Sequence, residues 1–435
     1  MDKTVIEATF PLTFRKEEAA ELGKQLKNRS SVVLVGMKRV GINNFLRFFL
    51  YHEKIVKTYI SPTQKHLFIP VDLNDLVEKE IFPFWRLTFK RIIDALEDSN
   101  YPVSIKTYAE ELFSSSIQSQ DLFLTIDGVR KTLQKIVENG IFPNIFFIRF
   151  DRIKDAVTPE FFANLQGLQD ATHGKLAYVF TSFRRLDILA PEVFTRASLS
   201  TFAQEMYMKP AKKEDMEIIY KTYKDEYKLT ISPAIEQSIF DLADGYVQYF
   251  QLVLIFLHEG KKEAKTKAEL FDLLLKDERI SLQSEELWES LSEKEKEIIV
   301  KISKGQAISD EERKLGRYIW DSGFLYESQN NIRALFSPLF DYYIQQKDKK
   351  PLSENGSIEF SRKEHALFSF LKDHISEICE REKIVEAVWP EVEELGVSDW
   401  AIDRLVARVR SKLKLQKSQY EIQTIKTRGY KLVPS

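Results

Sequence analysis

Two glycines near the beginning of the chain are spaced so that the backbone between them could bind phosphate. Gly36 and Gly41 are separated by four residues. The run 31–35 before them is rich in β-branched residues and predicts a buried strand, and 44–50 after them predicts a helix. Strand, glycine-spaced loop and helix in this order direct loop N–H groups and the helix N-terminus into one concavity. The spacing therefore predicts a loop that cradles phosphates.

The residues around the second glycine depart from that pattern. Ile42 occupies the place of the lysine that reaches the β- and γ-phosphates, and Asn43 replaces the Ser or Thr that holds magnesium. Lys38 and Arg39 precede Gly41 and would approach a phosphate from another side. Loss of the lysine from a site of low dielectric constant lowers the rate of phosphoryl transfer on the order of a thousandfold. We therefore assign no catalytic residue; nucleotide binding without turnover and a purely structural loop both stay open.

Further candidate residues follow two other predicted strands. The run 144–151 predicts a strand that ends in Asp151, an aspartate in position to orient magnesium, but Arg152 stands where a water-activating glutamate commonly follows. The run 176–180 predicts a strand after which Thr181 takes the usual position of a γ-phosphate sensor. The acidic strand, like the loop, is therefore predicted to lack a residue that an active ATPase needs.

One charge and one further strand complete this region. Arg149 is an unexpected cation inside the predicted acidic strand, and 66–72 predicts another strand. Strands that alternate with helices indicate a parallel sheet wound on both faces, so the expected fold class of this part is α/β.

The order and separation of these motifs resemble the STAND class of AAA-like P-loop ATPases, which in turn resemble archaeal origin-binding initiators. The resemblance covers about residues 10–345 and includes 242–246, where Val247 replaces the proline of the family's usual Gly-x-Pro motif. It implies a P-loop NTPase-like domain over 1–205, a helical lid over 206–280, and ATP or ADP with magnesium as the cofactor. The candidate nucleotide-binding residues are Gly36, Lys38, Arg39, Gly41, Ile42, Asn43, Asp151 and Thr181.

A first winged-helix-like domain is predicted over 281–346. Its expected helices are 285–302 and 311–322, and the runs 323–327 and 332–336 are expected to form a hairpin. Acidic residues dominate its second helix, which favours a spacer or a protein-contact module over DNA binding. The polar residues 347–357, with Pro and Gly among them, then predict a linker.

The last domain, 358–435, carries a concentrated positive charge. From Trp400 to Ser435 there are nine Lys or Arg residues against two acidic ones, whereas the whole chain has 64 basic and 66 acidic residues. A predicted helix, 398–413, places Arg404, Arg408 and Lys412 at i,i+4 spacing on one face, opposite an apolar face. A helix followed by a basic hairpin can enter a major groove and contact the neighbouring backbone.

This segment resembles the effector domains of PhoB/OmpR-type response regulators over about residues 357–434. The resemblance rests on four stretches of sequence, 360–364, 381–389, 399–413 and 425–432. It implies a recognition helix at 398–413 and a wing at 426–430, although Trp400 and Ala407 stand where such helices often carry Arg. The DNA-binding candidates are Trp389, Trp400, Arg404, Arg408, Arg410, Lys412, Lys426, Thr427, Arg428 and Tyr430.

Composition restricts the remaining possibilities. The single cysteine, Cys379, excludes an internal disulfide, and no Cys/His cluster has metal-ligand spacing. The start of the chain has no basic-then-apolar export signal, and the longest strongly apolar stretch, 252–257, is too short to cross a bilayer. We therefore expect a cytoplasmic protein without a metal site or a membrane partner.

These observations favour a DNA-binding transcriptional regulator that joins a winged helix to a degenerate P-loop ATPase-like platform. Its expected partners are double-stranded DNA and either further copies of itself or a protein effector. Two alternatives stay open: an active STAND-type ATPase, in which nucleotide controls the C-terminal module, and a protein-interaction scaffold. Ile42, Asn43 and Arg152 argue against the ATPase, and the local charge surplus argues against the scaffold.

Overall fold

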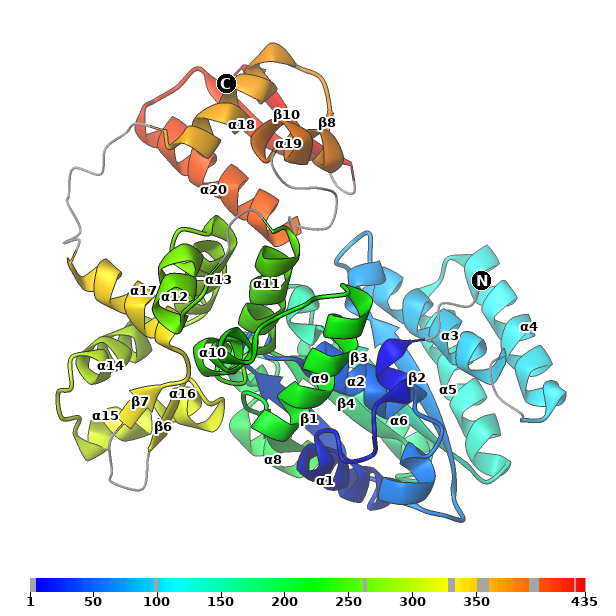
Figure 1. Ribbon diagram of the computed structural model, residues 1–435. Coiled ribbons are helices and arrows are strands. Elements are labelled where there is room, and N and C mark those ends of the chain that lie inside the picture. The colour runs from blue at the N-terminus through cyan, green and yellow to red at the C-terminus, as the bar shows by residue number, and fades with distance from the viewer. Residues whose placement is uncertain are drawn as a thin grey trace.

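A parallel five-stranded sheet forms the centre of the N-terminal part of the molecule (Figure 1). The computed structural model describes residues 5–97, 101–260, 264–327, 333–349, 360–390, 399–425 and 428–434. The strand order is β2-β3-β4-β1-β5, and every neighbouring pair is parallel. The strands are β1 (Ser31–Gly36), β2 (Lys65–Asp72), β3 (Ile141–Ile148), β4 (Ala177–Ser182) and β5 (Ala203–Met208).

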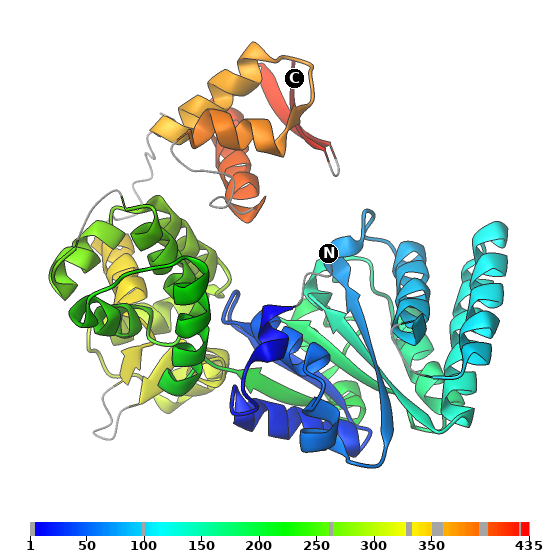
Figure 2. The same ribbon diagram turned by 45° about the vertical axis from the view of Figure 1, so that its right-hand side comes forward.

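Every residue of β1 and β4 is buried, as the apolar sequences of these strands predict for a sheet covered on both faces. Helix α3 lies beside β2 and α5 beside β3, and α4 packs on both helices at the outer edge (Figures 1 and 2). The helices of this part of the chain are α1 (Lys16–Lys27), α2 (Ile42–Tyr51), α3 (Ile81–Glu97), α4 (Val103–Ser119), α5 (Leu122–Glu138), α6 (Pro159–Ala171), α7 (Leu186–Leu189) and α8 (Arg196–Phe202). Shorter helical turns are η1 (Ile6–Thr9), η2 (Val56–Ile60), η3 (Leu73–Asp75) and η4 (Phe150–Ile153). The doubly wound α/β fold is confirmed.

A helical lid and a small α+β unit follow the sheet. The lid helices are α9 (Lys213–Glu226), α10 (Pro233–Ala243), α11 (Val247–His258), α12 (Lys267–Leu274) and α13 (Glu278–Glu289). The unit after them contains α14 (Glu293–Ser303), α15 (Asp310–Leu315), α16 (Arg317–Asp321), β6 (Leu325–Glu327), β7 (Arg333–Leu335) and α17 (Pro338–Lys349). Strands β6 and β7 form the expected antiparallel hairpin.

The prediction of one helix over 285–302 was wrong, because two helices, α13 and α14, occupy this stretch. The break lies where Ser292 caps α14: its hydroxyl accepts from the Glu295 backbone N–H, and the Glu295 carboxylate accepts from the Ser292 N–H. Helix α17 continues to Lys349, inside the predicted linker, and residues 350–359 lie outside the described part of the chain.

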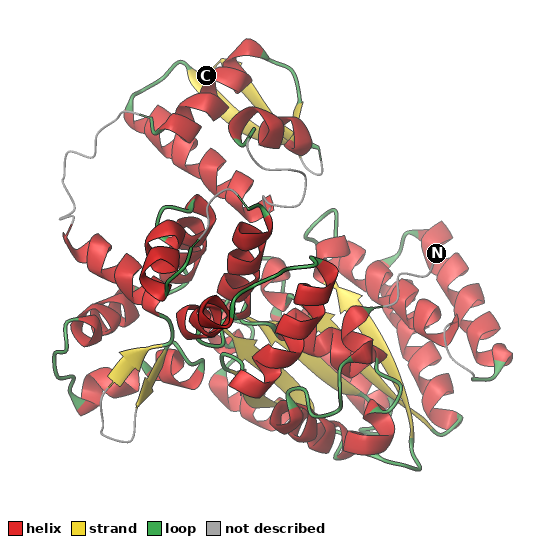
Figure 3. Cartoon of the chain, in the orientation of Figure 1, coloured by secondary structure: helices red, strands yellow, loops and turns green. Residues whose placement is uncertain are grey.

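The C-terminal domain has the helix and strand order of a winged helix. Its elements are α18 (Arg362–Asp373), β8 (Cys379–Glu380), α19 (Arg381–Val388), α20 (Asp399–Leu415), β9 (Tyr420–Ile425) and β10 (Gly429–Pro434). The strands form an antiparallel sheet in the order β8-β10-β9. Strand β8 was not predicted, because two residues carry too little pattern to be recognised. Figure 3 shows this small sheet packed against the three helices.

The buried apolar side chains form two separate cores. One core runs continuously from the sheet through the lid to the unit that contains β6 and β7. The other lies wholly within the C-terminal domain and includes Leu367, Ile384, Val406, Val409 and Leu432. In the described residues, no helix is both long and apolar enough to cross a membrane.

Candidate functional site

The predicted phosphate loop forms at the end of β1, but apolar side chains occupy its surroundings. Gly41 has φ 108° and caps α2, a backbone conformation that favours glycine. A Cβ atom on Gly41 would lie 2.8 Å from a methyl group of Val247, the first residue of α11. A Cβ atom on Gly36 would lie 3.1 Å from Cδ1 of Ile42. The residue in the lysine position therefore folds back over the start of the loop.

The two cations of the loop are engaged by the lid. Nε of Arg39 donates to the carboxylate of Glu286 on α13 over 2.9 Å, and Nζ of Lys38 lies 3.8 Å from the same carboxylate. The Glu286 side chain is only 7% exposed. The hydroxyl of Tyr246 donates to the Lys38 carbonyl oxygen over 2.7 Å. The Glu286 carboxylate thus already pairs with the two cations that a phosphate would need.

The predicted acidic strand ends earlier than expected, and a cation follows it. Strand β3 stops at Ile148, because Arg149 adopts a left-handed conformation with φ 62°. The Arg149 N–H donates to the Thr181 hydroxyl over 2.8 Å, and its guanidinium pairs with Asp72 at the end of β2. The prediction that the strand ends in Asp151 was therefore wrong, and this aspartate lies in η4.

The setting of Asp151 does not resemble that of a metal-orienting carboxylate. Burial raises its pKa, although the positive charges of Lys38, Arg152 and Arg149 oppose this rise. The hydroxyl of Thr181, the predicted γ-phosphate sensor, already accepts the hydrogen bond from the Arg149 backbone. Across the described residues, no group of three His, Cys, Asp or Glu side chains could hold a metal ion.

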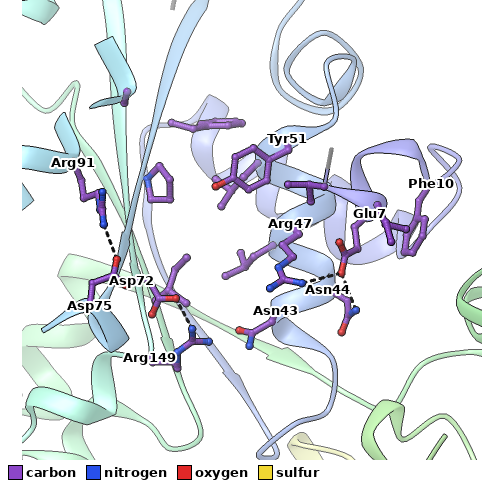
Figure 4. A pocket seen from close by; sticks show the side chains of 18 of the residues that line it. Glu7, Phe10, Asn43, Asn44, Arg47, Tyr51, Asp72, Asp75, Arg91 and Arg149 are labelled. Carbon is purple, nitrogen blue, oxygen red and sulfur yellow. Dashed lines mark hydrogen bonds and ion pairs between the residues drawn. The ribbon is translucent and has the colours of Figure 1, made fainter. Parts of the chain in front are cut away.

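A cavity of about 1010 Å³ opens between α2 and β2, beside the loop (Figure 4). Its lining carries five acidic side chains and three arginines, which gives a net charge of minus two. Most of these charges are paired within the cavity. Arg91 pairs with Asp75 and Asp94, at 2.7 and 2.8 Å, and Glu7 accepts from Asn44 over 3.0 Å. This lining does not favour a polyphosphate.

The second candidate site is the basic face of the C-terminal domain, which lies against the lid. Arg404 on α20 pairs with Glu289 and lies 3.5 Å from Glu285, and Arg408 pairs with Glu285. Both glutamates belong to α13. Figure 1 shows α20 above α11 and α13. Lys363 on α18 pairs with Glu278 at the start of the same lid helix.

The structure separates the other predicted members of this face. Nζ of Lys412 lies 2.6 Å from Glu364, a buried residue of the same domain, so Lys412 does not join Arg404 and Arg408 at the lid. Arg410 turns toward the small sheet, where it donates to the Ile422 carbonyl oxygen and the Thr424 hydroxyl, each over 2.8 Å.

The aromatic candidates belong largely to the domain core. Trp389 and Tyr430 are buried, and the Tyr430 hydroxyl donates to Asp403. Trp400 lies in α20, but its side chain is outside the described residues, as are Lys426 and Thr427. Arg428 is exposed in the turn before β10.

Sequence reasoning missed the acidic residues of α13. Glu278, Glu285 and Glu289 recur at helical spacing, a pattern that indicates a solvated face unless a basic partner is known. Glu286 was missed because its partner Arg39 lies 247 residues away in sequence.

The described residues form a parallel α/β core that is followed by a C-terminal domain with the helix and strand order of a winged helix. Residues 355–432 match the protein family described as "Transcriptional regulatory protein, C terminal". No curated protein matches the sequence at a significant level.

Several solved structures share a partial likeness with the chain. The Walker-type ATPase paby2304 of Pyrococcus abyssi has 15% sequence identity and a TM-score of 0.47, over 76% of this chain and 95% of that one. The Aeropyrum pernix ORC2 protein, in its ADPNP–ADP complexes, has 12% identity and a TM-score of 0.45, over 78% and 96% of the two chains. The Aeropyrum pernix ORC1 protein in complex with DNA has 11% identity and a TM-score of 0.37, over 98% and 90%.

Proposed function

We propose that this protein is a DNA-binding transcriptional regulator whose α/β core serves as a platform and does not hydrolyse ATP. The observation that carries the DNA-binding part is the face of α20, where Arg404 and Arg408 project together from a domain of the transcriptional regulatory family. A recognition helix reads base edges with such residues, and arginines pair with guanine or phosphate.

The residues of the core do not fit ATP and magnesium in the manner of a working P-loop ATPase. Ile42 lies over the loop in place of a lysine. Arg149 stands directly after β3 and pairs with Asp72, so a guanidinium, not a metal-orienting carboxylate, follows this strand. A cation that phosphoryl transfer uses is thus absent at position 42, and a guanidinium stands where an acidic metal ligand is expected, although this reaction depends on cations held close to the phosphates. This supports a platform function over the alternative of an ATP-driven switch.

The test is a salt-series titration of a fluorescein-labelled DNA duplex with the full-length chain. We expect binding whose affinity falls steeply with salt, because basic side chains displace counterions from phosphates. The double variant Arg404→Glu/Arg408→Glu should bind about a hundredfold more weakly or worse, since each lost arginine contact costs roughly 1–3 kcal/mol.

A matched control carries the same charge change far from α20. Arg130→Glu/Lys131→Glu alters a half-buried and an exposed cation on α5 and should leave the affinity for DNA within about threefold of wild type. Equal affinity of wild type and Arg404→Glu/Arg408→Glu for DNA would show that these residues of α20 do not contact it. Absence of salt-dependent binding to any duplex would favour a protein-interaction scaffold.

A further inference from the structure

The acidic face of α13 and the basic face of the C-terminal domain are complementary. Glu278, Glu285 and Glu289 lie on one side of α13, at positions that recur every seven and then four residues. Across from them lie Lys363, Arg404 and Arg408, the last two of which are the residues proposed to contact DNA. Carboxylates therefore stand where the phosphates and base edges of a duplex would stand.

This contact is electrostatic rather than apolar. Among the described residues, the two hydrophobic cores are separate clusters. The Glu285 side chain is nevertheless only 12% exposed, and those of Arg404 and Arg408 are 26% and 31% exposed. Partly buried ion pairs are screened less by solvent and salt than exposed ones, and they still weaken as the salt concentration rises. Such an interface can hold the domain and still release it.

Helix α13 is held firmly on its other side. Gln283 donates to the Tyr246 hydroxyl over 2.9 Å, and the Ser284 and Tyr249 hydroxyls lie 2.6 Å apart. Glu286 pairs with Arg39 of the loop. The acidic face therefore has a fixed position on the lid, and the C-terminal domain is the part that can move away from it.

We infer that α13 is an internal competitor of DNA: its acidic face sequesters Arg404 and Arg408, and the protein binds DNA only after α20 leaves the lid. The inference rests on the proposed DNA-binding function. One arginine cannot satisfy Glu285 and a phosphate at the same time, so the two states exclude each other. The apparent affinity for DNA is reduced by the fraction of molecules in the open state.

The experiment compares full-length wild type with Glu285→Gln/Glu289→Gln. Glutamine has nearly the same shape as glutamate, so the variant keeps the packing of α13 and removes only the charge. We expect about tenfold tighter binding to a fluorescein-labelled duplex of mixed sequence, because the open fraction rises. The control Glu293→Gln/Glu297→Gln makes the same change in net charge at two exposed positions of α14 and should leave the affinity unchanged.

A second measurement does not involve DNA. In small-angle X-ray scattering, the Glu285→Gln/Glu289→Gln variant should show a larger radius of gyration than wild type at low salt. Wild type should expand toward the same value as salt is raised, because salt screens the ion pairs. A radius equal to that of wild type under all conditions would overturn the inference.

The outcomes separate the inference from the proposed function. If wild type and Glu285→Gln/Glu289→Gln bind the duplex equally, α13 does not compete with DNA, while the DNA-binding function stands. If neither protein binds, and Arg404→Glu/Arg408→Glu behaves as they do, the proposed function itself fails. If the α14 control also gains affinity, the effect is one of overall charge and the inference is rejected.

Discussion

The proposal that the sheet edge does not hydrolyse ATP depends on two single residues. At the end of β1 an isoleucine lies where a phosphate-binding lysine is needed, and after β3 an arginine lies where a magnesium-orienting aspartate is needed. One change removes a positive charge and the other adds one nearby. Neither restores the function of the other, because the Arg149 guanidinium is committed to Asp72.

The buried imidazole of His66 gives a prediction at the same scale. His66 is 9% exposed and lies between Asn144 and Gln64, with its ring stacked on Phe142. Burial lowers its pKa from 6.5 to about 4. Between these values the unfolded chain binds more protons than the folded one, so His66 destabilises the fold as the pH falls through this window.

We expect His66→Gln to reduce the loss of stability between about pH 7 and about pH 5 by about 1–2 kcal/mol, after allowance for solvent screening. Urea unfolding midpoints of wild type and His66→Gln, measured at both pH values, would show this smaller loss of stability. The control His173→Asn changes an exposed histidine in a left-handed turn, a conformation that asparagine tolerates. A steeper pH dependence in His66→Gln than in wild type would contradict the assignment.

At the scale of elements, one buried arginine joins the sheet to the unit after the lid. Arg184 follows β4, and its guanidinium binds both oxygens of Glu295 at the start of α14, at 2.8 and 2.6 Å. The guanidinium carbon lies 3.7 Å from the ring centroid of Tyr318 on α16. The hydroxyl of Tyr318 donates to the Phe183 carbonyl oxygen over 2.7 Å. Three elements thus meet at a single side chain.

Removal of Arg184 should therefore be costly. Arg184→Met leaves Glu295 buried without its partner and should destabilise the protein by about 3–5 kcal/mol in thermal or urea unfolding. Arg184→Met/Glu295→Gln should recover part of this loss, because the uncompensated charge is gone. Arg313→Met, which breaks a more exposed pair with Glu327, should cost at most about 1 kcal/mol. Equal losses of unfolding free energy for Arg184→Met and Arg313→Met would show that Arg184 does not hold the three elements together.

At the scale of the whole molecule, the question is whether nucleotide acts on the protein. A ligand that binds only the folded state raises its stability, by about 2.7 kcal/mol at a hundred times its dissociation constant. Because the loop cations already pair with Glu286, we expect millimolar ATP with magnesium to leave the thermal unfolding midpoint unchanged. An increase of several degrees would revive the ATP-driven switch, and DNA affinity measured with and without ATP would then show its direction.

Much of this architecture could be predicted from the sequence. The β-branched run at 31–35 and the run at 66–72 indicated strands that the structure extends by one residue each. The strand that ends at Ile148 was predicted to run on to Asp151, because Phe150 continues the apolar run past Arg149. A left-handed conformation at a non-glycine residue ends it, and no local pattern signals such a turn.

The candidate DNA-binding face was also predicted only in part. The arginines of α20 were found because helical spacing and local charge are properties of one segment. Their partners on α13 were not found, because the ion pair between Arg404 and Glu285 joins residues that lie 119 positions apart. The break between α13 and α14 was missed although Ser292 and Glu295 form a recognisable capping sequence.

Helix α13 carries Glu285 and Glu286 as consecutive residues, and their side chains pair with different parts of the molecule. Successive side chains on a helix point about 100° apart, so Glu285 faces α20 while Glu286 faces the loop after β1. If a molecule that displaced Glu286 also shifted Glu285, the pairing of Glu285 with Arg408 would change, and the affinity for DNA with it. Thermodynamic reciprocity then requires that bound DNA alter the affinity of that molecule by the same factor. In that case the two neighbouring carboxylates would couple occupancy of the loop to occupancy of the DNA face.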